Sequence, residues 1–280
     1  MLRSELYKAF HNRGTYIAFL VGIVFAMLAF FVDDRGLIDM IIRIQRRDEW
    51  GMIYRNKENI GIPIYACWLG MRSSSYRYIL YFVMPLLCVL PHGMSYCKDI
   101  KSGYINQILS RVDCKKYYGA KLLSVMISGG CVCASPLIIN FILCMCVFPF
   151  TKPILGSGYF NIFNTNVLSE LFSEHAQIYV CVYILFVFMY LGLVSAISLG
   201  ITCFDQNIFI TMSTPFIILF TMHTICVWLL GKELMSPIRI IGMNEIYKKD
   251  VPYILIEILI IIVLTIPFTM KMFRKKGDII

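Results

Sequence analysis

The sequence contains few charged residues for its length. Only 15% of its 280 residues are Asp, Glu, Lys or Arg, whereas 59% are hydrophobic, and the mean hydropathy is +0.72. Because a soluble domain carries roughly 25% charged residues, this deficit excludes an ordinary water-soluble domain and predicts lipid as the main solvent. The net charge is +9, but the basic residues flank apolar runs, which indicates orientation in an anionic membrane and no nucleic-acid partner.

Several chemical motifs are also missing. The chain has no G-x-x-x-x-G-K-[ST] phosphate-binding loop, since Gly231-Lys232 is followed by Glu233, and it has no H-E-x-x-H zinc motif. The eleven cysteines form no CxxC pair and mostly lie in apolar runs, where they are expected to pack as small apolar side chains. We therefore expect no catalytic residue, no metal site and no disulfide framework. No cleavable signal peptide, internal repeat or low-complexity segment is evident.

Long apolar runs dominate what is present. They predict an all-α polytopic membrane protein, a single transmembrane domain over residues 1–280 with six transmembrane helices. The predicted crossings are residues 15–32, 78–94, 122–148, 177–204, 208–230 and 252–270. Residues 1–14 are expected to form an amphipathic helix on the inner leaflet, and residues 33–77 a large external loop with an amphipathic piece at 37–47. Pro85 and Pro91 should kink or end the second crossing, and residues 235–243 are apolar enough to dip into the headgroup region.

The distribution of Lys and Arg predicts the orientation. Segments on the side of the two termini carry thirteen Lys and Arg, the same number as the opposite side. The first thirteen fall in about 55 residues and the others in about 90, and short basic segments weigh most in the positive-inside rule. We therefore expect a multi-pass protein of the cell (plasma) membrane with both termini and residues 95–121 in the cytoplasm.

Residues 95–121 form a polar, basic segment between the second and third predicted crossings. Its apolar positions recur at helical spacing, at Ile100, Tyr104, Ile105, Ile108, Leu109 and Val112. The opposite face carries Lys98, Asp99, Lys101, Asn106, Gln107 and Arg111. A helix this short cannot span a bilayer, so it is expected to lie at the membrane surface or to dock onto a partner.

The motif Asp99-x-x-x-Gly103-Tyr104-Ile105, followed by Leu109-Ser110-Arg111 and Lys115-x-x-Tyr118-x-x-Lys121-Leu122, resembles the first cytoplasmic loop of type-2 ABC transporter permeases. The usual family pattern has Thr where Tyr104 stands and often Pro where Val112 stands. The resemblance implies that this loop is a coupling helix, which inserts an apolar stripe with charged flanks into a groove of an ATP-hydrolysing subunit. The implied ATPase-coupling residues are Asp99, Lys101, Gly103, Tyr104, Ile105, Ile108, Leu109 and Arg111.

The same resemblance implies a function and partners. The chain would be a transport subunit and not an enzyme, exporting or clearing an amphipathic substrate, most often a peptide such as a bacteriocin or lantibiotic. Its partners would be an ABC ATPase in two copies, a second permease, identical or homologous, and membrane lipids. ATP and Mg would be bound by the partner ATPase, with no cofactor in this chain. The alternatives are a membrane-embedded enzyme and an ATP-independent channel or secondary transporter.

Further residues are singled out inside the predicted crossings. By analogy with the family, a substrate path along the second and fifth crossings would be lined by Phe82, Pro85, Thr211, Phe216 and Phe220.

His223 and Glu257 lie in consecutive predicted helices, each roughly 10 Å below the outer boundary of the membrane. They either pair at an outer gate or substrate vestibule, or each reaches the interface or a hydrogen bond alone. The four-residue spacing of Gly192, Ala196 and Gly200 predicts close helix packing, within one subunit or between two. His92 is expected at the surface, and Tyr76, Tyr78, Tyr81, Tyr179 and Tyr183 in an interfacial belt.

Overall fold

The computed structural model describes residues 1–33, 35, 64–148, 150–153, 162–229, 231 and 236–271. These residues are 80% helical and form no strand, apart from an isolated bridge between Asn166 and Tyr247. The all-α class is therefore confirmed. The amphipathic piece predicted at residues 37–47, and with it most of the predicted external loop, lies outside the described residues.

Five helical segments in the described residues are long and apolar enough to cross a membrane, which indicates a membrane protein. The first is α2 (Arg13–Leu28), which continues into the π-helical turn η1 (Ala29–Asp33). The next two are α8 (Cys114–Val147) and α10 (Ala176–Thr202). The last two are α11 (Ile208–Thr224) with the turn η3 (Ile225–Leu229), and α13 (Val251–Met270). These segments correspond to five of the six predicted crossings.

The remaining predicted crossing, residues 78–94, is not confirmed as a helix of membrane length. Helix α5 (Ser75–Leu87) has 13 residues and ends two residues after Pro85, and residues 88–94 continue as turns. Such a helix is about 20 Å long, shorter than a hydrocarbon core of roughly 30 Å. Pro85 lies inside α5, where its missing N–H group removes the backbone hydrogen bond to the carbonyl of Tyr81, and Pro91 lies in the turns that follow the helix.

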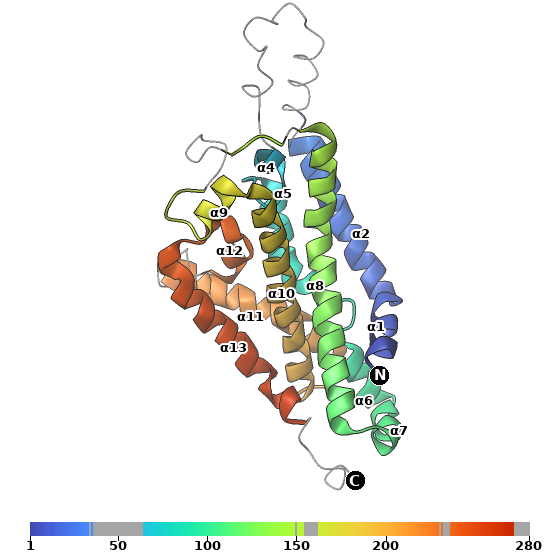
Figure 1. Cartoon of the computed structure of the whole chain (residues 1–280). Coiled ribbons are helices and arrows are strands. Elements are labelled where there is room, and N and C mark those ends of the chain that lie inside the picture. Colours follow the sequence, from blue (N-terminus) through green and yellow to red (C-terminus); the bar gives the residue numbers. More distant parts are fainter. Residues whose placement is uncertain are drawn as a thin grey trace, which may run out of the picture.

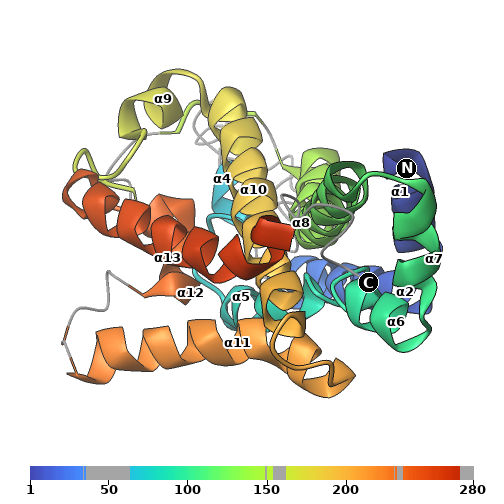
Figure 2. The same ribbon diagram turned by 90° about the horizontal axis from the view of Figure 1, so that it is seen from below.

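The helices surround a central pair, α8 and α10, as Figure 1 shows. Helices α1 (Leu2–Phe10) and α2 pack against α8, whereas α11 and α13 pack against α10. Viewed from below, these two groups lie on opposite sides of the central pair (Figure 2). We call the end of the molecule that carries α1, α6 (Ser95–Lys101) and α7 (Tyr104–Arg111) the α7 end. The opposite end, with α4 (Ile64–Cys67), α9 (Ser169–Glu174) and α12 (Pro237–Ile241), is the α12 end.

Small residues of α10 allow its neighbours to approach closely. A Cβ atom added to Gly192 would lie 2.8 Å from the carbonyl oxygen of Met126 in α8, and one added to Gly200 would collide with the backbone of Leu264 in α13. Ala196, between them, is buried. Of the two alternatives for this ridge, the structure thus shows packing within the chain, against two different helices.

The connection between α11 and α13 folds back over the helix bundle at the α12 end. Helix α12 buries Ile240 and Ile241 and is followed by the 3-10 turns η5 (Met243–Glu245) and η6 (Lys248–Asp250). The amide of Val167 donates to the carbonyl of Ile246 at 2.9 Å, and the amide of Lys248 donates to that of Thr165, also at 2.9 Å. These bonds join the segment that precedes α9 to the segment between η5 and the start of η6. They fix the position of Glu245, which lies at the end of η5.

The predicted tyrosine belt is wrong for three of its members. Tyr81, Tyr179 and Tyr183 are buried between helices, whereas Tyr78 is largely exposed. The hydroxyl groups of Tyr81 and Tyr183 lie 2.7 Å apart and hydrogen-bond to each other. A buried tyrosine needs such a partner for its hydroxyl, and a neighbouring helix provides it here.

Candidate functional site

The segment with the family-like motif consists of two short helices and the first turns of a third. Gly103, between α6 and α7, has a φ angle of 69°, in the left-handed region that glycine adopts without strain. Helix α8 then begins at Cys114, eight residues before the predicted start of the third crossing. The single predicted coupling helix is therefore a bent pair, α6 and α7, which lies at the tip of the α7 end (Figure 1).

The apolar stripe of α7 packs against helices of its own chain. Leu109 is only 4% exposed and belongs to a cluster with Tyr117 and Tyr118 of α8 and Phe268 of α13. Ile105 and Ile108 pack against the same cluster and are partly buried. The stripe expected to enter a partner's groove is thus largely occupied, because the first turns of α8 lie directly beneath it.

The surface that α6, α7 and the start of α8 leave exposed is polar and mostly basic. Exposed residues here also include Ser102, Ser110 and Asp113, and we call the following set the basic surface: Lys98, Lys101, Asn106, Gln107, Arg111, Lys115 and Lys116. Lys101 and Arg111 are the two predicted coupling residues that belong to it. A protein that binds here would have to present acidic side chains, because opposite charges guide association and set its register.

Asp99 is turned into the protein and not toward this surface. Its Oδ2 atom lies 2.6 Å from the Nζ atom of Lys121 and accepts a hydrogen bond of 2.6 Å from the hydroxyl of Tyr117. Both partners belong to α8. Asp99 therefore ties α6 to the long central helix α8.

Lys121 also connects α8 to the N-terminal helix. Its Nζ atom lies 2.7 Å from Oε2 of Glu5, and the exposed fractions of the Lys121 and Glu5 side chains are 1% and 0%. His92, in the turns after α5, lies with its Nε2 atom 3.0 Å from the same oxygen, and Lys8 binds the other carboxylate oxygen at 3.1 Å. We call Glu5, Lys8, His92, Asp99, Tyr117 and Lys121 the Lys121 cluster.

The Lys121 cluster keeps Glu5 ionised. Burial by itself would raise the pKa of Glu5, but the hydrogen bond with His92 and the positive charge of Lys121 outweigh it and hold that pKa well below its usual value. Tyr104 of α7 joins this region, because its ring lies 4.7 Å from the Nζ atom of Lys8. The expectation that His92 is a surface residue is wrong, since its side chain is buried in this cluster.

Three of the residues predicted for the substrate path come together. The ring of Phe82 in α5 lies 5.2 Å from that of Phe216 and 5.7 Å from that of Phe220, both in α11. Pro85 and Thr211 are instead buried, and the hydroxyl of Thr211 lies 3.4 Å from that of Thr202 in α10. The two helices therefore share an aromatic contact, but only part of the predicted lining faces it.

His223 and Glu257 have separate partners. The Nδ1 atom of His223 lies 2.5 Å from the hydroxyl oxygen of Ser236, whereas Glu257 is buried and accepts a hydrogen bond from Tyr190 of α10. Of the two alternatives drawn from the sequence, the structure thus shows separate hydrogen bonds and not a His223–Glu257 pair.

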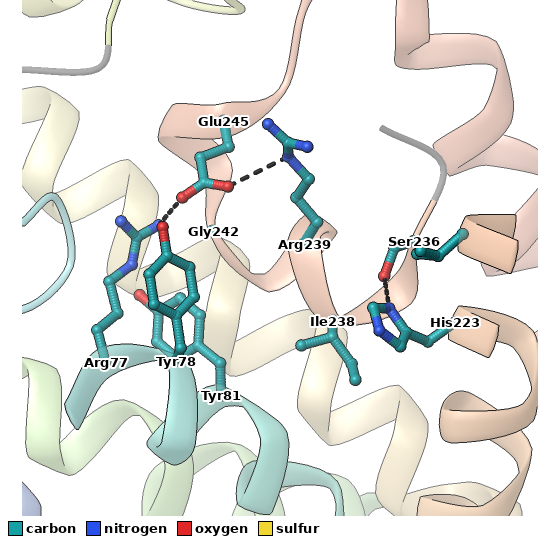
Figure 3. Close-up of a pocket in the computed structure, with 10 residues that line it drawn as sticks. Arg77, Tyr78, Tyr81, His223, Ser236, Ile238, Arg239, Gly242 and Glu245 are labelled. Atoms are coloured by element: carbon teal, nitrogen blue, oxygen red, sulfur yellow. Dashed lines mark hydrogen bonds and ion pairs between the residues drawn. The ribbon is translucent and has the colours of Figure 1, made fainter. Parts of the chain in front are cut away.

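A cavity of about 490 Å³ opens beside His223 at the α12 end, between α5, α11 and α12 (Figure 3). On its wall, Arg77 places Nη2 3.1 Å from Oε1 of Glu245, and Arg239 places Nε 3.2 Å from Oε2 of the same carboxylate. Its lining residues are Arg77, Tyr78, Tyr81, His223, Val227, Ser236, Ile238, Arg239, Gly242 and Glu245. The sequence prediction found only His223 here, because charged residues in predicted loops carry no signal that distinguishes a site from a solvated surface.

Among the residues that the structure describes, no group of three or more His, Cys, Asp and Glu side chains is arranged to hold a metal ion. No protein-family model, no curated protein and no solved structure matches the chain.

Proposed function

We propose that this chain is the permease subunit of an ATP-driven ABC transporter of the type-2 kind, and that a separate ATPase binds the α7 end. The observation that carries the proposal is the basic surface of α6 and α7, which is tied rigidly by Asp99 and Lys121 to the 34-residue helix α8. A displacement of α6 by a bound partner would therefore be transmitted to a helix that runs the length of the molecule.

The proposal includes six crossings, with the α5 segment as the second. In support, Lys271 at the end of α13 donates a hydrogen bond of 2.9 Å to Tyr96 of α6, and Glu5 of α1 contacts Lys121. The first and last described helices therefore begin and end at the same end of the molecule, which is what a chain with six passes would show. Together with the positive-inside rule, this arrangement favours a cytoplasmic location in the cell membrane for both termini and the basic surface.

The rest of the transporter would come from other chains. Two copies of the ATPase would bind ATP and Mg, and a second permease, identical or homologous, would complete the membrane part. Large apolar side chains of the α11 segment and of α13, such as Trp228 and Leu255, are exposed in this chain, so lipid or the second permease would cover them. The substrate would be amphipathic, since small permeases of the resembled layout often handle antimicrobial peptides and sometimes lipids, polysaccharides or drugs.

The test is charge reversal on the basic surface. We expect the double variant Lys101→Glu, Arg111→Glu, purified through a tag from its native membrane, to lose Mg-dependent ATP hydrolysis that accompanies the unaltered chain. Because repulsion at a charged interface costs several kcal/mol, the loss should be about tenfold or more. The matched control is Lys248→Glu, Lys249→Glu, which reverses two exposed lysines at the α12 end.

Equal ATP hydrolysis in both variants would remove the basic surface as the docking site. The absence of any ATP hydrolysis with the unaltered chain would remove the transporter proposal and favour the alternatives, an enzyme or an ATP-independent channel.

A further inference from the structure

The cavity at the α12 end combines a buried cation with an apolar opening. Arg77 is 1% exposed, and its guanidinium group is held by Asn244 Oδ1 at 2.8 Å, by the carbonyl oxygen of Arg72 at 3.3 Å and by Glu245. Its Nε atom has no hydrogen-bond partner among the described residues. A positive charge removed from water is weakly screened, so it acts strongly on a group that enters the adjacent cavity.

The fold makes room for this guanidinium group. A Cβ atom on Gly242 would lie 2.5 Å from the Nη2 atom of Arg77, so a larger residue at position 242 would displace the guanidinium group from its present position. The rings of Tyr81 and Tyr78 lie 5.1 Å and 5.7 Å from the Arg77 guanidinium carbon, and the geometry is visible in Figure 3. The arginine is thus fixed in place from three elements before any ligand arrives.

The remaining lining divides into a charged side and an apolar side. Arg239, 31% exposed, shares Glu245 with Arg77, so the described lining contributes two guanidinium groups and one carboxylate. Val227 and Ile238 form apolar lining, and beyond Val227 the side chains of Trp228 and Leu229 are largely exposed. The charged side, with its two guanidinium groups, would attract an anionic head. An apolar chain attached to that head would lie against Val227 and Ile238 on the apolar side.

We infer that this cavity binds a lipid-like amphiphile through an anionic phosphate or carboxylate head. A guanidinium group can donate two parallel N–H···O hydrogen bonds to two oxygens of either a planar carboxylate or a tetrahedral phosphate. The cavity volume of about 490 Å³ suits a small molecule or a lipid head and leaves no space for a long peptide. The inference deepens the proposed transport function, on which it rests, by naming the substrate class of one site.

The test measures binding to the purified chain alone, in a neutral detergent, without ATPase or ATP. The probes are dioctanoyl phosphatidylglycerol, which is anionic, and dioctanoyl phosphatidylcholine, which has the same chains and a zwitterionic head. We expect the anionic lipid to bind about tenfold more tightly, as one charge-assisted contact implies. Inorganic phosphate should compete only weakly, because it lacks the apolar chains.

The decisive variant is Arg239→Gln, since a substitution of the buried Arg77 can disturb folding. Arg239→Gln should reduce the preference for the anionic lipid to within about threefold, and the control Lys248→Gln, an exposed lysine at the same end, should leave it unchanged. Equal affinity for the two lipids in the unaltered chain would overturn the inference. So would an equal loss in both variants, which would indicate general surface charge, or displacement of the anionic lipid by inorganic phosphate alone at equal concentration.

Because no partner protein is present, the binding result is independent of the ATPase experiment. Loss of the lipid preference with normal ATPase association would reject this site and leave the transporter proposal standing. A normal lipid preference without any associated ATPase would reject the transporter proposal and leave this binding site standing.

Discussion

Two charged clusters among the described residues lie at opposite ends of the molecule and are built in opposite ways. In the Lys121 cluster one lysine lies between two carboxylates, and a histidine and a tyrosine complete the hydrogen bonding inside a packed interior. The second cluster, which we call the Arg77 cluster, consists of Arg77, Arg239 and Glu245, with the one carboxylate between two guanidinium groups beside a cavity. The Lys121 cluster is closed, because its polar groups bind one another and connect α1, α6 and α8, and we call it a structural joint. The Arg77 cluster is open, because it borders a cavity in which a ligand could bind.

The difference in surroundings determines what each cluster contributes to stability. A buried charge whose partner is removed stays uncompensated in a medium of low dielectric constant, which is strongly destabilising. A charge beside a cavity can recover hydration when its partner is lost. Substitutions at the two clusters should therefore differ in size even though both clusters contain buried ion pairs.

The largest effect is expected for Lys121→Met, which leaves Glu5 and Asp99 without their shared cation. The loss in unfolding free energy should be about 3–5 kcal/mol, measured by thermal or denaturant unfolding in detergent. The control Lys116→Met removes a lysine that is 74% exposed on the same helix and should change stability by less than about 0.5 kcal/mol. Similar small losses in both variants would contradict the description of the cluster as a buried joint.

Acidification should weaken the same cluster more gradually. Because the folded-state pKa of Glu5 lies below its ordinary value of 4.5, the ionised carboxylate contributes its full stability above that value. That contribution is lost as the pH falls from 4.5 toward the lower folded-state pKa, while Lys8, Lys121 and His92 face the carboxylate. Unfolding measured between pH 7 and pH 3 should show a steeper loss in the unaltered chain than in Glu5→Gln, and identical slopes would refute the role of Glu5.

A smaller loss is expected at the open cluster. Arg77→Met leaves Glu245 with Arg239 and with access to the cavity, so the cost should be about 1–3 kcal/mol, chiefly from the unpaired polar groups. The same unfolding assay measures it, with Lys121→Met as the reference. A loss equal to that of the reference would show that the cavity does not hydrate Glu245, and the comparison of a closed with an open cluster would fail.

The smallest change in stability belongs to Arg239→Gln. Its side chain is partly exposed, and ion pairs at such positions contribute about 0–1 kcal/mol. The prediction is a nearly unchanged unfolding curve together with a reduced preference for the anionic lipid. If Arg239→Gln unfolds as readily as Arg77→Met, then Arg239 stabilises the fold and the predicted difference between the two arginines is wrong.

The sequence was sufficient for the parts of the fold that depend on local composition. Apolar run length placed the fourth and fifth crossings at 177–204 and 208–230, within two residues of α10 and the α11–η3 segment. It placed the start of α8 too late, because the polar residues from Cys114 to Lys121 are helical and several of them are buried against other elements. Hydropathy treats such residues as loop, since it contains no information about tertiary partners.

Both clusters were beyond the reach of sequence patterns for the same reason. Glu5 and Lys121 are separated by 116 positions, and Arg77 and Asn244 by 167, so no helical spacing relates them. The motif around Asp99 drew attention to α6 and α7, but periodicity could not say which neighbour the apolar stripe of this segment would meet. That neighbour is α8, which follows directly in the chain and covers the stripe first.

The most direct test of the account is a photo-crosslinking amino acid placed at Gln107 on the basic surface and, as a matched control, at the exposed Glu174 of the α12 end. We predict that in native membranes position 107 crosslinks to an ATP-hydrolysing protein and position 174 does not. A crosslink to such a protein only from position 174, or none from position 107, would contradict the proposal that the α7 end receives a cytoplasmic ATPase.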